Sequence, residues 1–368
     1  MEGRPRHDGI GDAHGASIAN DEMEGTNSMP LRTKLTEKLG IRHPILLAPM
    51  GTASGGTLAK AVTEAGGLGI IGFGYGNQER IDQEFRAAGN ARVGCGFITW
   101  SLARQPHLLA RALDHKPAAV MLSFGDARPF VAAIKDAGAA LISQVQTVAQ
   151  AMEAVDMGSD IVVAQGTEAG GHGATRSTLA LVPAVVDAVR ERNDEIVVVA
   201  AGGIADGRGL AAALMLGAQG ALLGTGFLAS DEALTSAAAK AKLVAARGDD
   251  TIRTRVFDIV RNLDWLAVYT GRALQNAFSR QWHGRETELE KSLPTEAPRY
   301  ARAAEGNDLD TSVVFTGECV DLIRNVKPAA AIVASIVHEA ETALMSNLPL
   351  RGKRISAPFV PALHPKRR

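Results

Sequence analysis

The residue of this sequence that is best placed for chemistry is a histidine enclosed by glycines. His172 lies in the segment QGTEAGGHG, residues 165–173, which begins at the end of an apolar run. Glycines let a backbone approach a ligand closely, and an imidazole with a pKa of about 6.5 can accept a proton or donate a hydrogen bond near neutral pH. We therefore predict that His172 is catalytic; the alternative is a loop histidine without a chemical role. The other eight histidines lie in the tails or singly elsewhere, and no pair has metal-ligand spacing, so no metal site is predicted.

Two glycine-rich turns, AGGIADG at 201–207 and LGTG at 223–226, also follow apolar runs. Glycine exposes backbone N–H groups, and such a turn next to a helix N-terminus favours a bound anion. In a (β/α) barrel, the turns after the seventh and eighth strands are the usual phosphate site. Either turn alone could simply shape the chain. Because the two occur in consecutive units, together they predict that both bind one phosphate.

A third candidate is APMG at 48–51, where proline stiffens the end of the first apolar run and leaves the backbone of Met50 available to a flat ring. A methionine at this point could equally fill the core. Motifs of several other enzyme classes do not occur, since the sequence has no P-loop, no G-x-S-x-G turn and no H-E-x-x-H zinc motif. The segment GFGYG at 72–76 lacks the spacing of a dinucleotide fingerprint, so such a site is not predicted.

Eight apolar runs, each followed by a turn and a segment of helical periodicity, would position these residues. They are 45–48, 68–72, 93–98, 119–124, 140–145, 161–165, 196–200 and 220–224. Runs that are apolar throughout are typical of parallel strands buried on both faces. A doubly wound open sheet would show the same alternation, but eight strands within about 200 residues favour an α/β fold of the TIM (β/α)8 barrel type.

The chain is expected to divide into four parts. Residues 1–29 predict a disordered tail, 30–230 the barrel, 231–350 a helical second domain over one mouth of the barrel, and 351–368 a basic tail. In the second domain the strand pattern stops; helices are expected at 232–247, 251–260, 265–280 and 329–344, with a polar stretch at 284–310. Trp265, Tyr269 and Trp282 are interpreted as the core of this domain rather than as pocket residues.

Composition excludes several classes of partner. The 368 residues include 39 basic and 40 acidic side chains, which give a formal charge of −1. Proteins that bind nucleic acids or membrane surfaces usually carry an excess of basic side chains. A membrane-spanning helix needs about 18 consecutive apolar residues, and no stretch of the sequence is that long. The N-terminal residues do not resemble a secretory signal. Two cysteines far apart in the sequence suit a reducing compartment. We expect a cytoplasmic protein that acts on small molecules, without nucleic-acid or membrane partners.

With these segments in view, the sequence resembles the nitronate monooxygenase family, formerly called 2-nitropropane dioxygenases. The resemblance rests on APMGTASGGTLAKAVTEAGGLGIIG, VVAQGTEAGGHGA and VVVAAGGIADGRGLAAALMLGAQGALLGTGFLAS, and it covers about residues 30–280. YTGRALQNAF and FTGECVDLI also resemble the helical domain of the family. The resemblance implies a TIM barrel with one non-covalently bound FMN, which converts an alkyl nitronate and O₂ to a carbonyl compound and nitrite.

The same resemblance implies residue roles. His172 would be the catalytic histidine, and the FMN phosphate would lie on two turns, at Gly202 and Gly203 and at Gly224 and Thr225. The remaining cofactor-binding positions would be Met50, Gln144, Gln165, Gly170 and Gly171. Met50 would contact the flavin ring through its backbone, and the two glutamines would donate to the polar edge of the ring, with surface glutamines as an equal alternative. The segment VGCGFITW at 93–100 departs from the family, in which this strand often ends in an asparagine, and so indicates a different pocket.

Three hypotheses about function remain. The first is an FMN-dependent nitronate monooxygenase, whose partners are a nitronate and O₂ and in which His172 orients the nitronate and can take the α-proton of a neutral nitroalkane. The second is an FMN-dependent NAD(P)H reductase of quinones or enoyl thioesters, because such enzymes share the same sequence elements. The third is a non-catalytic phosphate-binding barrel, which the glycine-framed histidine disfavours. The sequence leaves the oligomeric state open, with a homodimer as one option.

Overall fold

Eight parallel strands form the central sheet of the protein, which a computed structural model describes over residues 31–346. The predicted tails at 1–29 and 351–368 lie outside the described residues. The strands are β1 Ile45–Leu47, β2 Ile70–Gly74, β3 Gly94–Ile98, β4 Ala119–Ser123, β5 Ala140–Val145, β6 Ile161–Gln165, β8 Val197–Ala201 and β9 Ala221–Leu223. Each coincides with one of the eight apolar runs. The sheet order β1-β9-β8-β6-β5-β4-β3-β2 closes through a parallel bridge between Leu46 and Leu68. The predicted TIM barrel is therefore confirmed.

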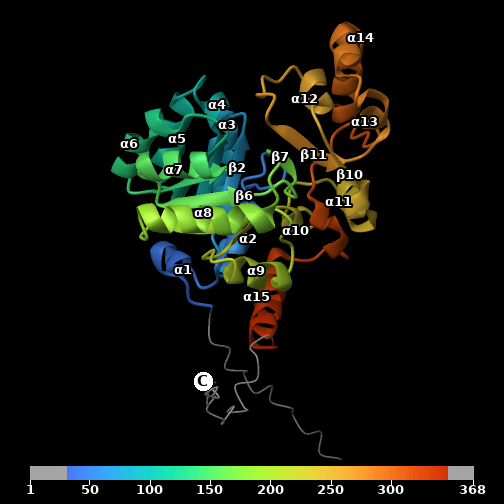
Figure 1. Ribbon diagram of the computed structural model, residues 1–368. Helices are drawn as coiled ribbons and strands as arrows, with labels where there is room; N and C mark the ends of the chain where they lie inside the picture. Colours follow the sequence, from blue (N-terminus) through green and yellow to red (C-terminus); the bar gives the residue numbers. More distant parts are fainter. Residues whose placement is uncertain (1–30, 347–368) are drawn as a thin grey trace, which may run out of the picture.

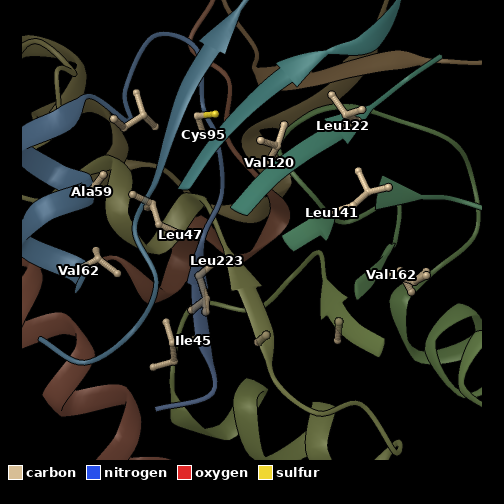
Figure 2. Packing of buried hydrophobic residues seen from close by; sticks show 14 of the residues in the cluster. Ile45, Leu47, Ala59, Val62, Cys95, Val120, Leu122, Leu141, Val162 and Leu223 are labelled. Atoms are coloured by element: carbon tan, nitrogen blue, oxygen red, sulfur yellow. The ribbon is translucent and has the colours of Figure 1, made fainter. Parts of the chain in front are cut away.

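The apolar runs fill two layers because successive side chains of a strand point to opposite faces. Val120 and Leu122 of β4 belong to the large buried cluster between strands and helices, which also contains Ala59 and Val62 of α2 (Figure 2). Met121, between them, belongs to a second buried cluster that fills the interior of the barrel. The same alternation on the other strands explains why each run is apolar throughout.

Helices surround the strands, as the periodicity of the intervening segments predicts. They are α2 Gly56–Glu64, α3 Gln78–Ala88, α4 Thr99–Leu102, α5 His107–Asp114, α6 Arg128–Asp136, α7 Val148–Asp156, α8 Thr178–Arg192 and α9 Gly207–Met215. Polar caps fix several starts: Asn77 Oδ1 accepts from the N–H of Arg80 at 2.9 Å, and Asp206 Oδ1 accepts from that of Gly209 at 3.0 Å. A short leading helix, α1 (Lys34–Leu39), adds its leucines to the interior cluster.

The last helix, α15 (Ala329–Ser346), corrects the expected division of the chain. The sequence analysis assigned it to the domain over the barrel mouth, but α15 packs against α9 and α2 (Figure 1). A Cβ at Gly207 of α9 would lie 2.3 Å from Glu339 Cβ, so glycine permits this close packing. Since α9 follows the strand before β9 and α2 follows β1, α15 takes the place of the eighth barrel helix. The residues between β9 and α15 are therefore an insertion that covers the barrel.

The insertion is mainly helical, as predicted, but it also contributes strands that the sequence analysis missed. Its helices are α10 Thr225–Leu228, α11 Ala237–Ala245, η1 Gly248–Asp250, α12 Val256–Val260, α13 Ala277–Trp282, α14 Glu286–Glu305 and η2 Glu318–Leu322. Two of its strands, β10 (Thr251–Thr254) and β11 (Thr270–Leu274), form an antiparallel sheet with β7 (Gly171–Gly173) of the barrel. The strands are short and carry arginines, so their pattern alone does not indicate a sheet. The polar stretch at 284–310 contains α14, the longest helix of residues 31–346.

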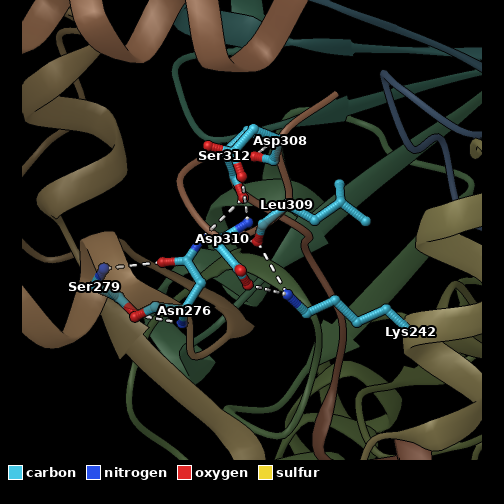
Figure 3. Close-up of polar contacts among 7 residues, drawn as sticks. All are labelled: Lys242, Asn276, Ser279, Asp308, Leu309, Asp310 and Ser312. Atoms are coloured by element: carbon cyan, nitrogen blue, oxygen red, sulfur yellow. Dashed lines mark hydrogen bonds and ion pairs between the residues drawn. The ribbon is translucent and has the colours of Figure 1, made fainter. Parts of the chain in front are cut away.

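Polar contacts hold the insertion together away from the barrel (Figure 3). Lys242 of α11 donates to the carbonyl oxygen of Leu309 and forms an ion pair with Asp310, both at 3.1 Å. Asn276 caps α13 and donates through Nδ2 to the carbonyl oxygen of Ser312 at 2.9 Å. Two helices and the loop after α14 are thereby joined. None of the helices in residues 31–346 is long and apolar enough to cross a membrane.

Candidate active site

A cavity of about 320 Å³ opens at the carboxyl ends of the barrel strands, beneath the insertion. All ten residues to which the sequence analysis gave a role line it: Met50, Gln144, Gln165, Gly170, Gly171, His172, Gly202, Gly203, Gly224 and Thr225. They come from five different strand ends and from the turns that follow them. Since parallel strands bring their carboxyl ends to one side of a barrel, the topology gathers residues that are up to 175 positions apart in the chain.

One end of the cavity consists of the predicted phosphate turns. Gly202 and Gly203 have φ angles of +106° and +72°, which disfavour any residue with a side chain. A Cβ at Gly202 would lie 2.7 Å from the hydroxyl oxygen of Thr178 and 2.9 Å from the carbonyl oxygen of Gly166. Among the described residues, neither glycine donates its N–H to a turn or loop acceptor. The turn therefore presents unpaired donors to the cavity.

Thr225 completes this end of the cavity from the adjacent turn. It is the first residue of α10, where backbone N–H groups lack a partner within the helix. Its hydroxyl oxygen accepts the N–H of Gly317 at 2.8 Å, and the hydroxyl also makes a hydrogen bond with Cys319, so the buried side chain is fixed. Next to it, a Cβ at Gly224 would lie 3.3 Å from Met50 Sδ. The N–H of Met50 donates to Ala48 at 2.9 Å, so the N–H group of Met50 is already used within the protein.

Amide side chains line the middle of the cavity. Gln165 Oε1 accepts from Nε2 of Gln144 at 3.0 Å and from Nε2 of Gln146 at 2.9 Å. These two donors fix the orientation of the Gln165 amide, and its own Nε2 donates to none of the residues in 31–346. The sequence analysis identified Gln144 and Gln165 but missed Gln146, which lies one residue beyond the strand. The arrangement leaves an oriented amide donor at the cavity wall.

His172 lies at the other end of the cavity, on β7, and is only 9% exposed. Its Nε2 lies 2.9 Å from Asp258 Oδ2, and because a carboxylate only accepts, this nitrogen carries the hydrogen. Nδ1 has no hydrogen-bond partner in the described part of the chain. Burial lowers the pKa of His172 below its ordinary 6.5, while the Asp258 carboxylate opposes that shift and the charges of Arg261 and Arg253 add to it. The imidazole is therefore neutral at pH 7, with Nδ1 as an acceptor.

The insertion supplies the partner of His172. Asp258 is buried on α12, and its second oxygen, Oδ1, accepts from Arg261 Nη2 at 3.0 Å. On β11, Gly271 lies directly opposite His172 in the sheet. A Cβ at Gly271 would lie 2.9 Å from the ring of Phe315 and 3.6 Å from His172 Nε2, so glycine makes room for the phenyl ring that lies beside the imidazole. The short sheet thus holds the histidine in place.

Aromatic side chains enclose the histidine. The indole of Trp265 stacks on the imidazole with ring centres 3.5 Å apart and an angle of 3° between the planes. Trp265 also donates through Nε1 to the hydroxyl of Tyr75 at 3.0 Å and meets the ring of Phe124 edge-on at 5.0 Å. Phe124 has a φ of +64°, a strained conformation for a bulky residue, and it directly follows β4. Strain of this kind at a cavity wall indicates a functional constraint on the ring.

The interpretation of the insertion's aromatic residues is right for Trp282 and wrong for Trp265. Trp282 packs with Phe257 and Phe278 in the core of the insertion, but Trp265 lines the cavity. Tyr269 is buried beside Phe124, with ring centres 5.1 Å apart. The sequence analysis also gave no role to four cavity residues: Tyr75, Phe124, Arg261 and Phe315. Phe315 is the first residue of FTGECVDLI, a segment that resembles the family, so the resemblance could have identified Phe315 as a cavity residue.

Comparison with known proteins identifies relatives over most of the chain. A family model described as nitronate monooxygenase matches residues 32–92 and 100–339. The gap between the two parts covers residues 93–99, in the segment where the sequence departs from the family. A nitronate monooxygenase of Neurospora crassa is 32% identical over 344 residues, which cover 82% of this chain and 90% of that protein.

Two solved structures are similar in three dimensions. FabK from Thermotoga maritima has a TM-score of 0.73 at 31% identity and covers 86% of this chain and 98% of its own. A nitroalkane oxidase from Streptomyces ansochromogenes has a TM-score of 0.70 at 28% identity and covers 85% and 99%, respectively. Because these matches cover 86% and 85% of this chain, the similarity includes both the barrel and its insertion.

Proposed function

Because this chain belongs to the nitronate monooxygenase family, we propose that it is an FMN enzyme that oxidises alkyl nitronates with O₂ to a carbonyl compound and nitrite. The observation that carries this proposal is the buried neutral histidine of the cavity. His172 offers Nδ1 to the cavity while Asp258 holds Nε2 at 2.9 Å. A base of this kind is needed to take a proton from the carbon next to a nitro group.

The residues at the opposite end of the cavity suit FMN. The left-handed turn at Gly202 and Gly203 leaves N–H groups unpaired, and Thr225 adds a backbone N–H at the start of α10. Donors of this type bind a phosphate without a basic side chain. Gln144 and Gln165 would face the polar edge of the ring, and Met50, Gly170 and Gly171 would lie against it. When bound, the flavin supplies the electron acceptor that the oxidation requires.

His172 and Asp258 would share the proton transfer. With a neutral nitroalkane, Nδ1 of His172 takes the α-proton, and the electron pair of the C–H bond moves into the nitro group to give the nitronate. The imidazolium that forms lies beside the buried carboxylate of Asp258, which stabilises its charge. With a nitronate, this proton has already left, so the neutral imidazole has no proton to take and the transfer step is not needed. Asp258 is therefore needed more for nitroalkanes than for nitronates.

The aromatic wall would keep water from the reacting carbon. Trp265, Phe124 and Phe315 surround His172 on several sides. Exclusion of water strengthens the interaction between the imidazolium and the carboxylate, because the local dielectric constant is low. The same wall limits the size of the alkyl group that the cavity accepts.

A second function, NAD(P)H-dependent reduction on the same scaffold, is favoured by one specific observation: the structural similarity to FabK extends over 86% of this chain at 31% identity. The two functions differ in the electron donor. A nitronate alone would reduce the flavin of a monooxygenase under anaerobic conditions, whereas a reductase would require NADH or NADPH.

The decisive experiment uses the purified holoenzyme in an anaerobic spectrophotometer. Oxidised flavin absorbs at about 450 nm. The loss of this absorbance is followed after addition of propyl-1-nitronate, NADH or NADPH. We expect rapid bleaching by the nitronate and slow or no bleaching by the nicotinamides, together with nitrite release in air. Bleaching by a nicotinamide alone would assign the reductase, and a preparation without flavin would contradict both functions.

A further inference from the structure

We propose that Arg261 and Tyr75 form a binding site for the anionic, two-oxygen group of the substrate, at the histidine end of the cavity. This inference rests on the proposed function and names the group of the substrate that the site would bind, namely a planar anionic group with two oxygens. Both residues line the cavity and neither belongs to the segments that carry the family resemblance in the barrel turns.

The charge of the cavity wall favours an anion. Among the described residues that line the cavity, two are arginines, Arg80 and Arg261, and none is an aspartate or a glutamate. Arg80 is already engaged, since it donates to the carbonyl oxygen of Gly72 at 3.2 Å and lies 3.8 Å from the carboxylate of Glu84. His172 adds no charge while it is neutral. Arg261 also pairs with a carboxylate, that of Asp258 at 3.0 Å, but this bond uses only one N–H of its guanidinium.

The guanidinium of Arg261 is fixed on one side and available on the other. Nε donates to the carbonyl oxygen of Phe257 at 2.7 Å, and Nη2 donates to Asp258 Oδ1 at 3.0 Å. Its carbon Cζ lies 5.5 Å from the ring centre of Phe315, another cavity residue. A further side-chain hydrogen bond joins Arg261 to Tyr75, and about a quarter of the Arg261 side chain is exposed. A guanidinium that is oriented by these bonds and still partly exposed is a strong donor to a carboxylate or a nitronate.

Tyr75 offers a second donor at the same place. Its hydroxyl oxygen accepts the indole N–H of Trp265 at 3.0 Å, which leaves the hydroxyl hydrogen for a ligand. Burial raises the pKa of Tyr75, and the positive charge of Arg261, together with the side-chain hydrogen bond between the two residues, opposes that shift. The phenol stays protonated at neutral pH and can donate to an anion. Since Trp265 stacks on His172, the two donors and the base share one wall.

Two sources of a two-oxygen anion are available in such substrates. One is the nitronate group itself, and the other is a carboxylate at the far end of a short substrate. Propyl-1-nitronate carries only the first, whereas propionate 3-nitronate carries both. If Arg261 and Tyr75 bind the nitronate group, their loss affects the two substrates equally; if they bind the carboxylate, it affects propionate 3-nitronate far more.

The test compares Arg261→Gln, Arg261→Lys and Tyr75→Phe with the wild-type holoenzyme. Arg128→Gln is the matched control, because Arg128 is exposed, pairs with Asp126 and lies outside the cavity. KM and kcat are measured by nitrite release with both nitronates. The dissociation constant of nitrate, a planar anion that does not react, is measured by calorimetry on the same preparations. Flavin content and the unfolding midpoint show that each variant is folded and loaded.

We expect Arg261→Gln to raise KM and the dissociation constant of nitrate about ten-fold or more, because a hydrogen bond to a charged group is lost. Tyr75→Phe should raise both about three-fold, Arg261→Lys should restore part of the loss, and Arg128→Gln should leave both unchanged. An unchanged KM and nitrate affinity in Arg261→Gln would overturn the proposal. A fall in kcat alone would also overturn it, because Arg261 would then only hold Asp258 in position. A wild-type protein that binds nitrate through Arg261 but releases no nitrite would contradict the proposed function and retain the anion site.

Discussion

The two ends of the cavity are built in opposite ways. The end proposed for the phosphate consists of backbone N–H groups from consecutive barrel turns, around Gly202, Gly203 and Thr225. The end proposed for the substrate consists of side chains, and His172 meets partners from the insertion, Asp258 and Trp265. Backbone donors depend on local turn conformation, whereas side-chain constellations depend on how distant segments pack. In the proposed enzyme, the barrel would provide the cofactor site and His172, and the insertion would provide the side chains that orient His172.

The largest expected effect tests the side-chain end. In His172→Ala, the base is lost, so kcat/KM for a neutral nitroalkane should fall at least about 100-fold, measured by nitrite release. Flavin content should stay unchanged, because the phosphate turns lie at the other end of the cavity. His107→Ala is the matched control, since His107 is exposed at the start of α5. Loss of flavin from His172→Ala would show that the two ends are not independent.

A smaller effect tests the backbone end. In Gly202→Ala, a Cβ would lie 2.7 Å from Thr178 Oγ1 and 2.9 Å from the carbonyl oxygen of Gly166, and the residue would keep a φ of +106°. The turn must shift, so the dissociation constant of the flavin should rise about ten-fold, measured by fluorescence during titration of the apoprotein. Gly138→Ala is the control, because Gly138 also has a positive φ, +72°, but a Cβ there meets nothing within 4 Å.

Gly138→Ala should lose about 1 kcal/mol of the free energy of unfolding from the left-handed backbone, and Gly202→Ala should lose more because its Cβ also overlaps Thr178 and Gly166; denaturant unfolding measures both losses. Only Gly202→Ala should lose flavin affinity. Equal flavin affinity in the two variants would contradict the role given to the turn.

The smallest effect separates the two substrates at the side-chain end. In Asp258→Asn, the carboxylate that stabilises the imidazolium is lost, so kcat for a neutral nitroalkane should fall about five-fold, with a lesser change for a nitronate. The Asp258 carboxylate raises the pKa of His172 against the effect of burial. Its removal should therefore lower that pKa further and move the acid limb of the pH–rate profile, which lies below 6.5, to still lower pH. A shift to higher pH would contradict this account of the pair.

The barrel and its cofactor end could be predicted from the sequence because both depend on local patterns. Runs such as 140–145 and 161–165 are apolar throughout, and the structure has β5 and β6 at those residues. Gly202 and Gly203 follow a strand directly, so their place at the carboxyl end of the barrel follows from the order of the elements alone. Where patterns were weak, prediction failed: β10 and β11 are short and carry arginines, and they are strands because β11 pairs with β7 and β10 pairs with β11.

By itself, the sequence determined the eight-stranded barrel, the positions of the glycine turns and the place of His172 at a strand end. Only the tertiary structure decided what His172 does there. Asp258 is 86 residues away in the chain, and Trp265 and Arg261 lie in a linker without a regular pattern. Their meeting depends on the register of β11 against β7, which places Gly271 opposite the histidine, and on the fold of the insertion over the barrel. Hydrophobic periodicity indicates which face of a helix or strand is buried. It does not indicate which distant polar residue a side chain of that element will contact.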